Sequence, residues 1–266
     1  MAVPEVLRMD SYRHGATIGG IVSACTVILI WEVSVRLFSV PSYLLPSPSQ
    51  IGLALVENYD PILHHGSYTL ISIISGFFLG VVLGVPLAIL LTFSRLFEIT
   101  AYPIIVFLQI IPKIAIAPIF IIWFGFGLFP KVLLVFLLTF FPITVSMVAG
   151  LRSCDADLLE LARSTGASSA RIFFFVRIPS ALPDLMTGLK VAAALAATAA
   201  IVAEFVAADR GLGYLLLTYN GEMNTTMVFA TVLALGILGL VVYYAVEVFE
   251  RMTIPWHVSA REKKQH

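Results

Sequence analysis

The chain has 266 residues and no net charge, with 59% hydrophobic and only 12% charged residues. Soluble domains carry about 25% charged residues, and the long apolar stretches here lack the polar face that a helix of a soluble protein shows. This composition excludes an ordinary soluble domain, and the lack of a basic block excludes a nucleic-acid-binding surface. Uncharged stretches that can cross a hydrocarbon core of about 30 Å recur, so we expect an all-α polytopic membrane protein with six transmembrane helices.

The first apolar stretch, at about residues 16–35, predicts a transmembrane helix that is retained in the protein. Its apolar part is long and no small-x-small cleavage site follows it cleanly, so it does not fit a cleaved signal peptide. Glu32 and Arg36 stand four residues apart near its end, in the order that favours an ion pair within a helix.

A proline-rich segment, VPSYLLPSPSQ, follows the first span. Its prolines prevent a continuous helix through Pro48. We expect a short helix over residues 50–57, capped by Ser49, because serine accepts hydrogen bonds from the first turn of a helix. Its apolar positions suit a helix that lies on the membrane surface: Ile51, Leu53 and Leu55.

Five further apolar stretches predict the remaining spans: residues 66–93, 99–123, 132–151, 185–208 and 223–246. The third span overall contains Pro103, Pro112 and Pro118, which predict a broken helix whose free carbonyls surround a cavity. The fifth contains the small-residue run VAAALAATAA, which lets another helix approach closely. A dimer seam and a packed core helix both fit that run, and we prefer the core helix.

Three ionisable residues fall inside these spans: Lys113, Lys190 and Glu204. A charged side chain at the bilayer centre costs about 2.5–3.5 kcal/mol on insertion scales, so each needs water or a partner. Lys113 either faces the translocation path or snorkels to the interface, and we favour the path. Lys190 and Glu204 are fourteen residues apart, or about 21 Å along a helix, so they cannot pair with each other. We expect Lys190 to snorkel, and Glu204 to gate the path or to brace a neighbouring helix.

Basic residues in the loops predict the orientation, because cytoplasmic loops carry the excess of lysine and arginine. With the N-terminus inside, three of them lie outside: Arg36, Lys131 and Arg210. Eleven lie inside: Arg8, Arg13, Arg95, Arg152, Arg163, Arg171, Arg177, Arg251, Arg261, Lys263 and Lys264. Both termini are therefore expected in the cytoplasm.

The chain shows no catalytic or metal-binding signature. Cys25 and Cys154 are expected to be small buried hydrophobes without a disulfide, and no serine-histidine-acid set occurs. The histidines lack metal-ligand spacing: His14, His64, His65, His257 and His266. We expect the His64–His65 pair in an interfacial loop. The pattern G-x-x-x-x-G-K-[ST] is absent, so the chain is expected to bind neither ATP nor another cofactor.

The most charged stretch, ELARSTGASSARIFFFVRIPSALP at residues 160–183, predicts a cytoplasmic helix–glycine–helix elbow. Asp155 or Asp157 can cap the first helix, and Gly166 permits a turn with positive φ. We expect the second helix to end at Pro179 and Pro183. Its apolar residues are expected to dip toward the membrane: Ile172, Phe173, Phe175 and Val176. A solvated basic loop is the alternative from the residues alone.

The spacing Glu160-x-Ala162-x-x-x-Gly166, nine residues, then Val176-Arg177-Ile178-Pro179 resembles the EAA loop of the inner-membrane permease subunits of ABC importers. Leu161 departs from the second alanine of that pattern, and Val176 and Ile178 replace isoleucine and leucine. Three phrases resemble the nitrate, sulfonate and taurine branch more loosely: YLLPSPSQI, PKIAIAPIFIIWFGFG and RGLGYLL.

The resemblance implies a type I importer permease fold, with the EAA loop as a coupling helix that docks on a cytoplasmic ATPase over residues 157–169. It assigns ATPase coupling to five residues: Glu160, Ala162, Gly166, Ile178 and Pro179. It implies that the segment DRGLGYLL forms a re-entrant bend and an outer gate at Gly211, Gly213 and Tyr214, where a plain outer loop is the alternative. We assign the translocation path to three residues: Gln109, Lys113 and Glu204.

The resemblance also implies the partners and the domain layout. Two copies of the permease, two ATPase chains that use ATP-Mg and an extracytoplasmic binding protein would assemble in the lipid bilayer of a bacterial plasma membrane. Residues 1–15 and 251–266 would be cytoplasmic tails, and residues 16–250 one permease domain with its coupling loop at 152–183. The expected substrate is a small anion such as nitrate, a sulfonate or taurine, although related permeases import vitamin precursors.

Two other classes of function fit the sequence less well. A secondary transporter that works alone would show repeated halves and chains of buried carboxylates, and the sequence shows neither. An intramembrane enzyme would need a catalytic set, which is not visible.

Overall fold

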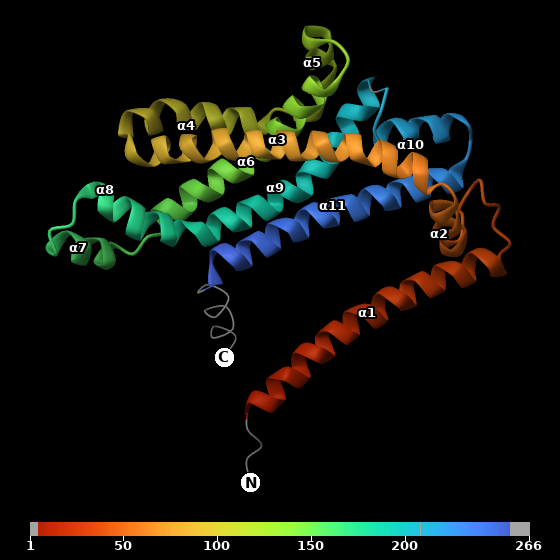
Figure 1. Ribbon diagram of the computed structural model, residues 1–266, viewed down its shortest axis with the longest axis horizontal. Coiled ribbons are helices and arrows are strands. Elements are labelled where there is room, and N and C mark those ends of the chain that lie inside the picture. The colour runs from red at the N-terminus through yellow and green to blue at the C-terminus, as the bar shows by residue number, and fades with distance from the viewer. Residues whose placement is uncertain (1–4, 208, 256–266) are drawn as a thin grey trace.

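The computed structural model describes residues 5–207 and 209–255, except for the side chains of residues 5–18, 21 and 207. The described chain is built from helices (Figure 1). In order they are α1 (Glu5–Leu37), α2 (Pro48–Glu57), α3 (Tyr59–Phe93), α4 (Arg95–Ile110), a 3₁₀ turn (Lys113–Ile116), α5 (Ala117–Phe124), α6 (Leu128–Arg152), α7 (Ala156–Ser164), α8 (Ser169–Ile172), a π-helical turn (Phe173–Arg177), α9 (Ile178–Ala207), α10 (Leu212–Gly221) and α11 (Thr225–Thr253).

Four of the described helices are long and apolar enough to cross a membrane: α3, α6, the helix Ser169–Val206 and α11. They coincide with the predicted spans 66–93, 132–151, 185–208 and 223–246. Helices α4 and α5 give a fifth if the pair, bent by 85°, counts as one broken span, as the prolines predicted for residues 99–123. The predicted span 16–35 lies in α1, which is not among these helices, so the total of six stays a prediction. Ala208 and most of the predicted tail at 251–266 lie outside the described residues.

Helix α6 lies between α3 and α9 and packs closely against both. A Cβ atom added at Gly76 of α3 would lie 2.5 Å from the Cβ of Val135 on α6, and one at Gly188 of α9 would lie 2.5 Å from the Cβ of Ser146. Three glycines at four-residue spacing bring α3 against α6: Gly76, Gly80 and Gly84. This spacing is the small-xxx-small pattern that lets membrane helices approach.

The alanine run of α9 is the centre of the bundle. Five of its alanines are completely buried: Ala192, Ala193, Ala196, Ala199 and Ala200. They pack with residues of α3, α6 and α11, such as Ile73 and Val135. One face of the run is therefore a core face, as preferred. Val191 and Leu195 on the other side are 49% and 36% exposed, so a dimer seam on that side stays untested.

The prediction that Lys190 snorkels to the interface is wrong. Its ammonium forms an ion pair with the carboxylate of Glu250 on α11, and only 16% and 5% of the two side chains are exposed. The sequence reasoning missed this pair because Glu250 lies beyond the predicted end of the last span, whereas α11 continues to Thr253. Removing one partner of a buried pair leaves an uncompensated charge, so the pair ties α9 to α11.

Helix α2 begins earlier than predicted. Its cap is Ser47 rather than Ser49: the Ser47 hydroxyl accepts a hydrogen bond from the Gln50 backbone N–H, and the Gln50 side chain accepts one from the Ser47 N–H. Pro48 then occupies the first helical turn, where its missing N–H costs nothing. Ser49 instead donates to Glu32, which also forms the predicted ion pair with Arg36.

The expectation of two buried cysteines is wrong for Cys25. Cys25 is exposed on α1, and Cys154 after α6 is half-buried. Figure 1 shows the reason: α1 runs apart from the other long helices except near its C-terminal end. There Val35 is buried and Trp31 lies 6.2 Å from Phe229 of α11 between ring centroids.

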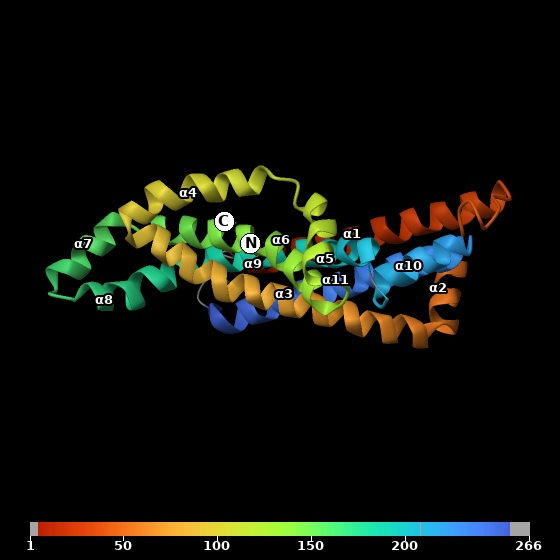
Figure 2. The same ribbon diagram turned by 90° about the horizontal axis from the view of Figure 1, so that it is seen from above.

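The bundle has two distinct ends along its long axis. Figures 1 and 2 both show α7 and α8 at one end and α2 and α10 at the opposite end. The charged elbow and the DRGLGYLL segment are therefore separated by the length of the long helices.

We predict that Gly76→Ala destabilises the protein because its methyl group would overlap Val135. Overpacking of this kind costs about 1–3 kcal/mol. Gly236→Ala on α11 is the matched control, because nothing lies within 4 Å of its added Cβ. The check is the Tm of the detergent-solubilised protein, measured as loss of the monodisperse peak in size-exclusion chromatography. A Tm for Gly76→Ala equal to that of the control would contradict the packing described.

Candidate functional site

The charged elbow is a helix–glycine–helix hairpin, as predicted. Helix α7 is capped by Asp155, whose carboxylate accepts a hydrogen bond from the Asp157 N–H at 2.9 Å. Gly166 turns the chain with φ of +77°, and Ser168 caps α8. The glycine is needed for its backbone angle alone, because nothing lies within 4 Å of its missing side chain.

The first helix of the hairpin presents an amphipathic, uncovered surface. Leu158 and Leu161 are 45% and 62% exposed, and Glu160 is exposed without an ion pair or hydrogen bond to the described residues. Ala162 is half-buried. Leu158 and Leu161 stand three residues apart and share one side of α7, and Glu160 lies on an adjacent side. An exposed pair of leucines with a carboxylate beside it suits a contact with another protein.

The second arm of the hairpin is fixed to the bundle by Ile172 and Phe173. Ile172 is buried, and the Phe173 ring meets that of Phe93 edge to face at 4.8 Å between centroids. Val176 is half-buried, whereas the Phe175 ring is 77% exposed and packs little against the rest of the chain. That these residues dip toward the membrane stays a prediction.

The prediction that Pro179 and Pro183 end the second helix is wrong. Helix runs from Ser169 to Val206, with a π-helical turn at Phe173–Arg177. A π-turn displaces the hydrogen-bond ladder by one residue, and the Pro179 ring lies directly after it, in the first turn of α9. Ile178 and Pro179 are half-buried there and connect the hairpin to α9 without a break.

Gln109 and Lys113 lie together at the break between α4 and α5. The Lys113 ammonium donates to the Gln109 carbonyl at 2.9 Å and lies 4.9 Å from the centroid of the Phe141 ring. These residues and two others of α6 line an open hollow of about 250 Å³: Gln109, Lys113, Phe141, Pro142 and Val145. The broken helix thus frees a carbonyl beside a cavity, as the prolines predicted.

Glu204 is not part of that hollow. It is 1% exposed, accepts a hydrogen bond from the Thr69 hydroxyl at 2.9 Å, and accepts another from the Gly213 backbone N–H at 2.8 Å. The structure therefore joins Glu204 to the predicted gate residues rather than to Gln109 and Lys113. The segment is bound to buried side chains rather than free, but whether it is an outer gate or a plain outer loop stays a prediction.

Two residues of the predicted gate, Gly211 and Tyr214, contact His65 of α3. The Gly211 N–H donates to His65 Nδ1 at 3.1 Å, and the Tyr214 ring stacks on that imidazole at 5.6 Å between centroids. His64 and His65 lie within α3 rather than in a loop, because this helix begins at Tyr59. Thr69 and His65 were not predicted from the sequence. Thr69 is one of several hydroxyl residues in the span 66–93, so nothing in the sequence distinguished it.

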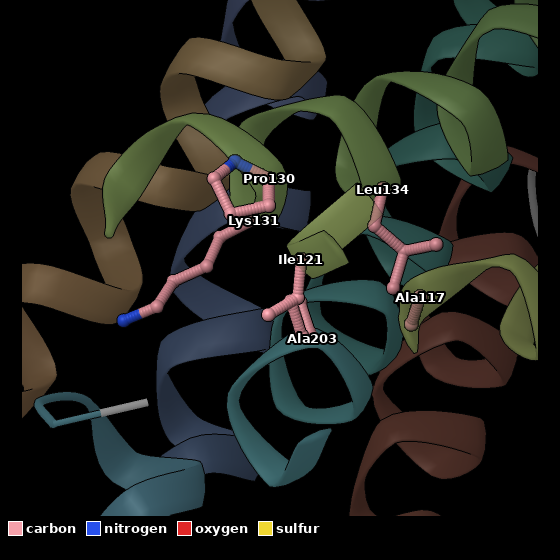
Figure 3. Close-up of a pocket in the computed structure, with 6 residues that line it drawn as sticks. All are labelled: Ala117, Ile121, Pro130, Lys131, Leu134 and Ala203. Atoms are coloured by element: carbon pink, nitrogen blue, oxygen red, sulfur yellow. The ribbon is translucent and has the colours of Figure 1, made fainter. Parts of the chain in front are cut away.

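Lys131, predicted to lie in an outer loop, is 95% buried in the first turn of α6. Its ammonium donates to the Arg210 carbonyl at 2.8 Å. Figure 3 shows its side chain running away from Ala117 and Leu134, past a small cavity of about 10 Å³. Arg210 itself is exposed, and its hydrogen bond to the Tyr68 hydroxyl raises the pKa of the guanidinium, so this position stays cationic.

This arrangement is that of a multi-helix membrane protein with an exposed hairpin at one end and a glycine-containing segment bound to buried side chains at the other. No group of three or more metal-binding side chains occurs within the described residues. Residues 76–254 match the family described as "Binding-protein-dependent transport system inner membrane component". The chain belongs to this family, the permease subunits of ABC importers.

Curated relatives support the same family. The chain is 38% identical to the formylaminopyrimidine transport permease protein ThiX of Halalkalibacterium halodurans, over 86% of this chain and 92% of that protein. It is 33% identical to the riboflavin transport system permease protein RibX of Chloroflexus aurantiacus, over 96% of each. It is 29% identical to the taurine transport system permease protein TauC of Escherichia coli, over 87% and 86%. The resemblance to the sulfonate and taurine branch is thereby confirmed.

A solved structure shares the fold. A chain of the MetNI methionine ABC transporter, in an inward-facing conformation, superimposes with a TM-score of 0.61 and 23% identity, over 70% of this chain and 92% of that chain. At this identity the likeness concerns the fold alone, which is that of an ABC importer permease.

We predict that Gly166→Val opens the hairpin, whereas Gly166→Asn leaves it intact. A β-branched residue is a strong outlier at positive φ, while asparagine tolerates it. The left-handed conformation costs an L-residue about 1–2 kcal/mol, so local opening should rise about 5- to 30-fold. Trypsin cleavage at Arg163 and Arg171 in the purified protein measures this opening. Equal cleavage rates for both variants would show that the turn does not depend on glycine.

Proposed function

We propose that this permease forms the translocation path of an ATP-driven importer and is coupled through residues 152–183 to a separate ATPase, which hydrolyses ATP-Mg. The observation that carries the proposal is the uncovered surface of α7, where Leu158 and Leu161 are exposed on one side and Glu160 is exposed on the adjacent side, without an ion pair to the described residues. A carboxylate on an exposed hairpin complements a basic groove on a soluble partner. In this proposal the chain has no catalytic residue of its own.

The continuous helix from Ser169 to Val206 supports the proposal that a movement of the hairpin is passed on to the bundle. Because Ile178 and Pro179 continue directly into α9, a displacement of α7 and α8 is passed to the central helix of the bundle. Glu160, Ala162 and Gly166 would contact the ATPase, and Ile178 and Pro179 would connect that contact to the path.

The assembly we propose has two copies of this permease, two ATPase chains and an extracytoplasmic binding protein, in the plasma membrane of a bacterium. Both termini and the hairpin would be cytoplasmic. The distribution of basic residues supports this orientation: α4 begins at Arg95 and α6 ends at Arg152 at the hairpin end (Figure 1), whereas Arg36 ends α1 beside α2.

For the path itself, we assign the hollow at Gln109 and Lys113 to contact with the substrate. The half-buried Lys113 ammonium and the N–H groups of the Gln109 side-chain amide are donors that would favour a small anion such as a sulfonate. The segment with Gly211, Gly213 and Tyr214, held by Glu204, would close the path on the outer side.

A second substrate class is a heterocyclic vitamin precursor, such as a thiamine pyrimidine or a flavin. The Phe141 ring in the same hollow favours it, because aromatic rings stack on one another, and the 38% identical relative is named for formylaminopyrimidine transport. A transporter that works without an ATPase is a more remote alternative.

We predict that Glu160→Lys abolishes retention of the ATPase and ATP-driven uptake. The reversed charge would repel the basic groove that the carboxylate is proposed to meet, at a cost of several kcal/mol. Copurification of the ATPase and uptake into proteoliposomes measure the two effects. Glu57→Lys on α2, at the opposite end, makes the same charge change and should retain the ATPase. Normal retention and uptake in Glu160→Lys would refute the coupling assignment, and uptake without any ATPase would support the stand-alone alternative.

We predict that Lys113→Met lowers anion uptake about tenfold or more while assembly stays normal, because a hydrogen bond to a charged group contributes about 1.5–3 kcal/mol. Lys113→Arg keeps the charge and is the matched control. Initial uptake rates of taurine and of formylaminopyrimidine, each with its own binding protein, are compared at equal complex abundance. Loss restricted to taurine would favour the anion, and unchanged rates for both would place Lys113 outside the path.

A further inference from the structure

The loop between α9 and α10 is bound at four consecutive residues by side chains of three helices. The Lys131 ammonium donates to the Arg210 carbonyl at 2.8 Å, and the Gly211 N–H donates to His65 Nδ1 at 3.1 Å. The Leu212 N–H donates to the Thr69 hydroxyl and the Gly213 N–H to the Glu204 carboxylate, both at 2.8 Å. We call these four side chains and the loop Arg210–Gly213 the clasp.

Glu204 connects the loop of the clasp to α3. Its carboxylate binds both the loop, through Gly213, and α3, through the Thr69 hydroxyl, which in turn accepts from Leu212. The carboxylate fills the space that loop side chains would occupy: a Cβ atom at Gly211 would overlap its oxygens, and one at Gly213 would lie 2.7 Å from the Glu204 Cβ. Gly211 also has φ of +121°, which disfavours any other residue.

The clasp buries two opposite charges that depend on the loop backbone. Glu204 is 1% exposed and Lys131 is 5% exposed. The Glu204 carboxylate accepts a hydrogen bond from the Gly213 N–H, and the Lys131 ammonium donates one to the Arg210 carbonyl. Each side chain is therefore paired with the backbone group that complements it. A buried charge without a partner is costly. If the loop moved away, Lys131 would lose the Arg210 carbonyl and Glu204 would keep only the Thr69 hydroxyl, so the bound loop is favoured over a displaced one.

We propose that the clasp is the latch of the permease. In this proposal Glu204 and Lys131 hold the loop Arg210–Gly213 over the outer end of the path, and release of the clasp is the step that opens the path to the outside. The inference rests on the proposed outer-gate function and adds the residues that hold the gate closed. Glu204 is then a positioning residue that acts on the backbone of the loop, not a contact for the substrate.

A latch of this kind makes a thermodynamic prediction. If ATP binding by the ATPase favours the outward-open state of the permease, then a change that favours the outward-open state must also favour ATP binding, because coupling is reciprocal. Weakening the contacts of the outward-closed state should increase the outward-open state about 10- to 100-fold, the range for loss of a hydrogen bond to a charged group. Because ATP binding is proposed to accompany outward opening, ATPase activity without binding protein should rise and net uptake should fall.

The test uses the whole permease with its ATPase in nanodiscs, with Cys25→Ser and Cys154→Ser as background and Leu212→Cys as reporter. Leu212 is 2% exposed, so a membrane-impermeant maleimide should label the introduced thiol slowly. Glu204→Ala and Gly213→Ala should speed labelling at least tenfold. Glu204→Gln, which keeps the shape and one carbonyl acceptor, should have an intermediate effect and serves if the alanine variant does not fold.

Gly66→Ala is the matched control, because its added Cβ would lie 3.9 Å from the nearest atom, in Leu212, which is ordinary contact. Its labelling should equal that of the parent. Unchanged labelling in folded Glu204→Gln and Gly213→Ala would overturn the clasp. Faster labelling with unchanged basal ATPase activity would overturn its role as a latch. Failure of the ATPase to copurify would refute the proposed function separately, because labelling of the permease alone still tests the clasp.

Discussion

The close approach of α6 to α3 on one side and α9 on the other is the constraint on which the rest of this permease depends. Lipid tails are as apolar as leucine, so helices in a membrane gain little from burying apolar surface against each other and rely on tight packing. Glycines at 76, 80 and 84 of α3 and Gly188 of α9 permit that packing because no side chain intervenes. The buried alanines of α9 extend the same close-packed layer toward α11.

Helices α6 and α9 also connect the two ends of the molecule. The hairpin α7–α8 lies in the chain between α6 and α9, and the π-helical turn passes it into α9 without a flexible joint. At the opposite end, Lys131 in the first turn of α6 and Glu204 near the end of α9 hold the same glycine loop. A displacement of α6 against α9 at the hairpin would therefore act directly on the two charges that bind the loop.

The polar groups inside the bundle have three kinds of partner. Lys190 and Glu250 pair with each other between α9 and α11 and so hold two long helices together. Glu204 and Lys131 bind backbone groups of the segment 210–213 instead. The Lys113 ammonium binds a carbonyl that the broken helix frees beside an open hollow. In a low-dielectric interior each of these groups needs its partner, because an unpaired buried polar group is costly.

Apolar length alone predicted the main spans, because a helix that crosses a membrane follows from local composition. The hairpin followed from the resemblance of residues 160–179 to the EAA loop, together with local rules for helix caps and for a glycine at positive φ. The prolines of residues 99–123 predicted a broken helix, since proline cannot continue the hydrogen-bond ladder, but Pro103 lies within α4 and the sequence did not say where the break falls. It could not predict that Lys190 pairs with Glu250, or that Glu204, His65, Thr69 and Lys131 converge on one loop. Apart from the contact of Glu204 with Gly213, nine positions away, those contacts join residues 60 to 146 positions apart. Only the packing of α3, α6, α9 and α11 decides which distant polar groups face each other. The continuation of helix through Pro179 was likewise decided by tertiary structure, because Ile172 and Phe173 hold the preceding turn against the bundle.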